Sequence, residues 1–330
     1  MNMKKALKSS MAVQRIPGGL ILFFFLAVFT AGPVLSSSHA AITPNEVYGR
    51  FDLAAKQLDV ILKASGGVPD RTGILAEKGL KPMHVYQMAV SCIEAIHIYQ
   101  LKNSITPVPI IIATPRKYTP GDVLKLADIV VTEVNRIARH KGVQVLGRDA
   151  GAFSGKSPTH VFSRVAAVYL KISALSGLKQ ITPNEVFAQM FRAQDDAKSI
   201  LGKIDPARRY RVDVPDSPPG LTPGDVLAET LKARESLNET RAHFGLTPVP
   251  VPVLKPGAKI LPTDVFIQTQ IIIAEMKIIK IATGTVSATP LPVPVTGKTP
   301  SDVHQQAVTL EYLLGQIGSL EKLVKIMETK

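Results

Sequence analysis

The sequence predicts an all-α protein of two tandem four-helix bundles, whose eight helices are joined by long proline-rich extended connectors. Three observations lead to this fold class. A short motif of the form Thr-Pro-X-Asp/Glu-Val recurs, an apolar heptad follows each copy, and about six turns of chain after each copy contain no proline. The eight motif prolines are Pro44, Pro82, Pro120, Pro158, Pro183, Pro223, Pro262 and Pro300. Their spacing is close to 38 residues except between the fourth and fifth copies.

Each position of the motif suits the first turn of a helix. The Thr hydroxyl is a good N-cap, and Pro is favoured at the first helical position because it has no N–H to leave unpaired. An acidic residue three positions after the cap completes a capping box and lies favourably in the helix dipole. One copy has Leu261 in place of the hydroxyl residue, and two copies have His84 and His160 in place of the carboxylate. The motif therefore predicts eight helix starts.

The motif valine begins an apolar heptad, which is weak only in the sixth copy, after Val226, and which predicts helices packed side by side with a left-handed twist. Cys92, the single cysteine, falls on such a seam and is interpreted as a small core residue. A reactive thiol or an intermolecular disulfide is the alternative. The predicted seams span residues 47–61, 85–99, 123–137, 161–175, 186–200, 226–240, 265–279 and 303–317.

The connectors alternate proline with β-branched residues, as in TPVPIIIAT from Thr106 and TPVPVPV from Thr247. This pattern favours extended or polyproline II backbone, which is long enough to run back along a helix. Such a return would let consecutive helices start at the same end. The alternative is an up-and-down arrangement with connectors wrapped around the ends, and we favour it slightly because parallel bundles of consecutive helices are rarer. In either case the apolar connector residues are expected to pack on the bundle surface.

An internal duplication is indicated by the fifth copy, ITPNEVF, which repeats the first, ITPNEVY, almost letter for letter. The connector that precedes the fifth copy shrinks to residues 177–181. We therefore expect a first four-helix domain over residues 41–178 and a second over residues 179–330.

Residues 1–40 read as a secretory signal peptide. A basic segment without acids precedes an apolar run over residues 20–29, and Ser38-His39-Ala40 offers a small-x-small cleavage site. We expect a periplasmic or secreted protein cleaved after Ala40, with an inner-membrane protein anchored by an uncleaved N-terminal segment as the alternative. The apolar stretch 266–281 contains Glu275, Lys277 and Lys280 and is interpreted as a central bundle helix.

Candidate binding residues are few. His84 and His160 occupy equivalent motif positions on helices expected to lie diagonally in the first bundle, so together they are weak candidates for a metal or anion site. The alternative interpretation is that each histidine only replaces the carboxylate that caps the helix in the other copies. Arg208, Arg209 and Arg211 flank a tyrosine in a charged connector and are weak candidates for an anion contact. Acids such as Asp196 are assigned to exposed helix faces, and no motif for a cofactor is found.

The charge balance favours acidic partners. Loss of four positive charges with the signal would lower the formal net charge from +13 to +9. We expect an exported, non-enzymatic scaffold or interaction module whose partner is an anionic envelope polymer, a lipid surface or another envelope protein, and not a nucleic acid. The alternative is a helical-bundle protein that binds a small anion, a metal or an apolar ligand. An enzyme is not expected because the predicted seams carry no Asp, Glu, Lys or Arg, whereas a catalytic bundle needs polar groups that point inward.

Overall fold

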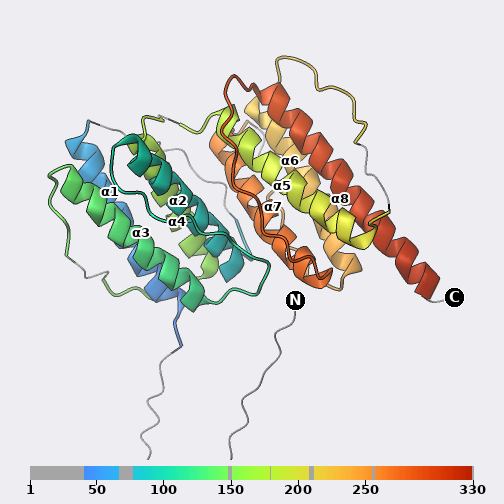
Figure 1. The fold of residues 1–330 in the computed structure, drawn as a ribbon, viewed down its shortest axis with the longest axis horizontal. Coiled ribbons are helices and arrows are strands. Elements are labelled where there is room, and N and C mark those ends of the chain that lie inside the picture. The colour runs from blue at the N-terminus through green and yellow to red at the C-terminus, as the bar shows by residue number, and fades with distance from the viewer. Residues whose placement is uncertain are drawn as a thin grey trace, which may run out of the picture. The chain divides into compact units, whose positions relative to one another are not determined.

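A computed structural model describes residues 41–66, 77–147, 151–178, 180–207, 212–254 and 257–328, with side chains up to residue 320. Within these ranges the chain forms eight α-helices and no strand, which confirms the predicted fold class (Figure 1). The signal-peptide segment and Arg208, Arg209 and Arg211 lie outside the described residues. The helices are α1 (Pro44–Ala64), α2 (Pro82–Lys102), α3 (Pro120–His140), α4 (Pro158–Leu175), α5 (Pro183–Ile204), α6 (Pro223–His243), α7 (Pro262–Ala282) and α8 (Pro300–Glu328).

Every helix begins at its motif proline, and the third residue of each helix caps it. In six copies the backbone N–H of the N-cap residue donates to the Asp or Glu side chain, as Thr222 does to Asp225 over 2.7 Å. The remaining two copies use a histidine. The Nδ1 atoms of His84 and His160 accept the N–H of Lys81 at 2.8 Å and of Ser157 at 3.1 Å. Both histidines therefore replace a capping carboxylate.

The motif valines form the first layer of each core. All eight are buried, with 1% or 2% of their surface exposed, so the predicted seams point inward. Cys92 is also fully buried, and its Sγ lies 3.5 Å from the carbonyl oxygen of Val165. Its interpretation as a core residue is confirmed, because it packs between α2 and α4.

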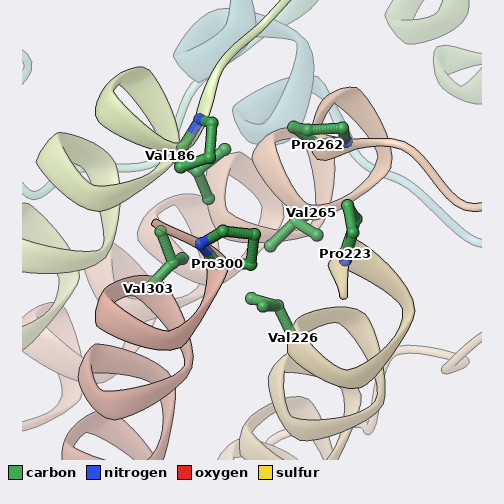
Figure 2. Close-up of a pocket in the computed structure, with 8 residues that line it drawn as sticks. Val186, Pro223, Val226, Pro262, Val265, Pro300 and Val303 are labelled. Carbon is green, nitrogen blue, oxygen red and sulfur yellow. The ribbon is translucent and has the colours of Figure 1, made fainter. Parts of the chain in front are cut away.

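The helices within each bundle are parallel. In the second bundle the first-turn prolines and valines of α5, α6, α7 and α8 surround one small apolar pocket, so four helix N-termini meet at one end (Figure 2). The corresponding residues of α1 to α4 surround a matching pocket in the first bundle. The slight preference for an up-and-down arrangement was wrong. Four aligned dipoles repel one another, and the capping carboxylates at their positive ends offset part of that cost.

Neighbouring helices follow the same order in both bundles. In the first, α4 and α3 each contact both α1 and α2, which lie diagonally; in the second, α8 and α7 each contact both α5 and α6. The repeated order supports the predicted duplication. It also corrects the expected placement of His84 and His160, because α2 and α4 are neighbours and not diagonal partners.

The connectors run back along the helices, which is what brings every helix start to the same end. The connector from α2 to α3 leaves beside Gln100, whose Oε1 accepts the N–H of Val108 at 2.7 Å. It arrives beside the start of α2, where Tyr118 stacks on Tyr86 at a centroid separation of 3.9 Å. Val108 and Tyr118 are buried, so this connector packs on the bundle as expected.

Side-chain amides hold other connectors in the same way. Gln57 of α1 donates to the carbonyl of Gln144 at 3.0 Å and accepts the N–H of Leu146 at 2.7 Å. Asn238 of α6 makes both bonds to Val249, at 2.8 and 2.9 Å. An extended connector has backbone N–H and C=O groups that no neighbouring β-strand pairs with. Each side-chain amide forms hydrogen bonds with these groups, as the peptide group of a strand would.

The near-identity of the first and fifth motifs has a structural reason. Asn45 and Asn184 occupy the variable position of those two motifs, and each accepts a backbone N–H over 2.8 Å, from Lys156 and Lys298 respectively. Both lysines directly precede the motif that starts the last helix of their own bundle. The same contact therefore ties the first and last helices together in each half.

The two bundles pack against each other through α2 and α7, and residues Ile42–Lys330 form one compact unit. Both helices are buried on most of their surface, which confirms the interpretation of the 266–281 stretch as a central helix. Among the described helices, none has the length and apolarity that a membrane crossing requires. The domain boundaries at residues 40/41 and 178/179 stay predictions.

Candidate functional site: a buried polar interface between the bundles

Polar side chains at heptad spacing cover the faces by which the two bundles meet. On α2 these are His84, Gln87, Ser91 and Glu94, separated by three, four and three residues. On α7, Gln268 and Glu275 are one heptad apart, as are Gln270 and Lys277. Each set forms a second stripe on a helix whose apolar seam already faces its own bundle. The interface is therefore polar, whereas the bundle cores are apolar.

Besides Asp264, which caps α7, and Glu229 of α6, ten ionisable side chains of this interface and the elements around it are buried among the described residues, none more than 7% exposed. The carboxylates are Glu77, Glu94, Asp196 and Glu275, and the potential cations are His84, Arg192, Arg234, Arg241, Lys277 and Lys280. The assignment of Asp196 to an exposed face was wrong, because its side chain has no exposed surface. A charge buried in this way is tolerated only with a partner and hydrogen bonds.

Glu275 joins both bundles by binding His84 of α2 and Arg241 of α6. Burial lowers the pKa of His84 to about 3, so the ring is neutral. Since its Nδ1 accepts the Lys81 N–H, its Nε2 carries the proton, and this nitrogen lies against the Glu275 carboxylate. Burial also lowers the pKa of Arg241, to about 10, which leaves this guanidinium charged at neutral pH. Glu275 is thus held by one charged and one neutral donor.

Glu94 of α2 and Arg192 of α5 form a second link between the bundles. Two guanidinium nitrogens lie 3.0 and 3.1 Å from the two carboxylate oxygens, a bidentate pairing. Arg192 also donates to Gln189 at 2.8 Å. Burial raises the pKa of Glu94 and the nearby Arg192 charge opposes that rise. The pair therefore fixes the relative position of α2 and α5.

The buried cations also bind connector carbonyls. Arg192 donates to Pro290 at 2.7 Å, Arg234 to Pro250 at 2.9 Å, Arg241 to Thr247 at 3.1 Å and Lys280 to Ser287 at 3.0 Å. Each of these four cations is also paired with a carboxylate. The pairs are Arg192 with Glu94, Arg234 with Glu77, Arg241 with Glu275, and Lys280 with Asp196. One set of side chains thus fastens both the bundles and the connectors of the second bundle.

Lys277 differs from the other four cations. Its Nζ donates to Gln87 Oε1 across the interface, and within the described ranges no carboxylate lies within ion-pairing distance of it. Burial is the main cause that lowers its pKa from 10.5 to about 7. Gln87 in turn donates to Gln270 Oε1 at 2.9 Å, and Ser91 donates to the same oxygen at 3.0 Å.

The two histidine candidates lie in different environments. His84 is fully buried, with its Nδ1 capping α2 and its Nε2 against Glu275, whereas His160 is exposed at the start of α4, where its Nδ1 lies 2.9 Å from Ser157 Oγ. The described residues contain no group of three or more side chains suited to holding a metal. A joint metal or anion site at His84 and His160 stays a prediction, and no contact between the two histidines supports it.

Comparison with known proteins gives no relative: no protein-family model, no curated protein and no solved structure matches the chain. The sequence did contain a signal for the interface. The polar heptads of α2 and α7 stand out in helices that are otherwise strongly apolar, and a search for a second stripe opposite each valine seam would have found them.

Proposed function

We propose that the chain is an exported, non-enzymatic helical scaffold that binds anionic partners of the cell envelope through the C-terminal end of its first bundle. The observation that carries this proposal is the parallel arrangement of α1 to α4. It gathers at one end the basic residues that an up-and-down bundle would divide between two ends.

The basic end is defined by five exposed residues of the first three helices and their caps. Because α1, α2 and α3 start together and each has 21 residues, they finish at the same level, about 32 Å away. Lys141 Nζ lies 6.0 Å from the ring centroid of Tyr99, which places the ends of α2 and α3 together. The residues of this basic end are Lys63, Lys102, Arg139, His140 and Lys141.

The charges of the basic end exceed what the helix dipoles balance. Four helix C-termini together contribute roughly −2 elementary charges. The last turns of α1 to α4 contain no Asp or Glu, whereas Lys63, Lys102, Arg139 and Lys141 each carry a full positive charge. The remaining excess is exposed to solvent and would attract a polyanion or an anionic surface.

The non-enzymatic part of the proposal is supported by how the interior charges are used. Four of the five buried cations at the bundle interface pair with carboxylates of the same chain and with connector carbonyls. These groups stabilise the contact between the bundles and are not directed at an open pocket. This internal use of the charges supports a scaffold role.

Binding to immobilised dextran sulfate, with neutral dextran as the reference, tests the proposal. The test variant replaces Lys63, Lys102 and Lys141 with serine. The control variant replaces three exposed lysines elsewhere in the first bundle, Lys78, Lys117 and Lys125, and so removes the same net charge.

We expect the test variant to bind at least tenfold more weakly than the control variant, and the binding of the unaltered chain to weaken as salt is raised. Equal losses in the two variants would show that net charge alone determines binding. Absence of binding by the unaltered chain at low salt would contradict the proposal as a whole.

A further inference from the structure

Among the ten buried ionisable groups named above, cations outnumber carboxylates by one once the neutral His84 is set aside. Four acid–base pairs account for all four carboxylates, and Lys277 is the remaining cation. Its side chain is 1% exposed and its Nζ contacts Gln87 on the opposite bundle. A positive charge at this position would therefore be both desolvated and without a counter-ion of its own.

The groups that face Lys277 come from three helices. α2 contributes Glu94, α5 contributes Arg192 and Asp196, and α7 contributes Lys280. The two carboxylates attract a charged Lys277, but Arg192 already pairs with Glu94 and Lys280 already pairs with Asp196. These two cations repel a third positive charge, so the surroundings as a whole favour the neutral amine.

We propose that Lys277 makes the contact between the two bundles sensitive to pH: as a neutral amine it lets α2 and α7 close on each other, and its protonation favours their separation. The neutral amine still donates a hydrogen bond to Gln87, so the closed interface loses no contact when the proton is absent. When the interface opens, the amine reaches water and can bind the proton at its ordinary pKa.

The direction of the effect follows from the two pKa values. Burial lowers the pKa of Lys277 to about 7 in the closed interface, whereas the hydrated amine of the open state has a value near 10.5. The open state therefore binds more protons between these two values. The contribution of Lys277 to closure is therefore fully present above pH of about 10.5, falls about tenfold per pH unit as the pH drops towards 7, and does not change further below that.

Hydrogen exchange of the full chain tests the proposal, with protection factors corrected for the intrinsic exchange rate at each pH. We expect the amides of α2 and α7 that open with the interface to lose about 100-fold in protection between pH of about 9 and 7. Lys277→Met should remove this dependence, because the sulfur side chain fills similar space without a proton to bind. Lys125→Met, an exposed lysine on α3, is the control and should behave like the unaltered chain.

A second measurement covers the case in which Lys277→Met does not fold. In the unaltered chain, the carbon-13 shift of each lysine Cε reports its own ionisation, and one lysine should titrate near pH of about 7. The proposal is overturned if every lysine titrates near its ordinary value. It is also overturned if protection does not change with pH, or changes equally in Lys277→Met.

Discussion

Glu275 offers the sharpest test of the buried interface, since it is 2% exposed and binds one residue from each bundle. In Glu275→Leu, Arg241 remains buried without a counter-ion, a defect that typically costs 3 to 5 kcal/mol. His84 also loses the carboxylate that its Nε2–H lies against, and a buried donor left without any polar neighbour costs about 1 to 3 kcal/mol. Because the two defects share one site, we expect a total loss of about 4 to 6 kcal/mol.

Urea unfolding followed by far-ultraviolet circular dichroism measures this loss. It is a large part of the roughly 5 to 15 kcal/mol by which domains are usually stable, so the midpoint should fall sharply. Glu239→Leu, an exposed glutamate on α6, is the control and should change stability by no more than about 0.5 kcal/mol. The double variant Glu275→Leu/Arg241→Met removes both charges and should recover most of the lost stability. A loss below about 1 kcal/mol in the single variant, or no recovery in the double one, would refute the reasoning.

Two further predictions concern individual contacts. Asn45→Ala and Asn184→Ala each leave a connector N–H without its acceptor, and each should lower the free energy of unfolding by about 1 kcal/mol. Their effects should add in thermal unfolding of the double variant, since the two sites lie in different bundles, and a strongly non-additive result would count against independent sites. Burial raises the pKa of the Cys92 thiol, so alkylation at neutral pH should follow the unfolded fraction in urea. Rapid alkylation of the folded chain would show that α2 opens locally.

The helix starts could be predicted from sequence because their signals are local. A capping residue, a proline and a carboxylate within four positions determine where a helix begins. Two altered copies keep the capping bond, because the Leu261 N–H still donates to Asp264 and His84 still accepts a backbone N–H. The inward direction of the valine seams was also predictable, because a heptad leaves only one face for an apolar stripe.

The direction of the helices was not predictable, because it depends on contacts between distant residues. The connectors are long enough for either arrangement. The parallel one is stabilised by amides such as Gln57, which binds a connector 87 residues further along the chain. The polar interface escaped prediction for a related reason. Lys277 looks like a surface residue until the first bundle covers it. Asp196 looks like one until Lys280 of α7 and Thr289 of the following connector pack on it, so the burial of each follows from tertiary packing and not from its own helix.

The return connectors also have a consequence for how quickly the chain can reach its native state. Up-and-down bundles fold fast because neighbouring helices form local hairpins. Here α1 and α2 lie diagonally, and α1 packs instead against α3 and α4, whose first residues follow its own by 76 and 114 positions. Loops of this length must close before the core can form, so the protein should refold at a rate more typical of β-sheet domains than of helical ones.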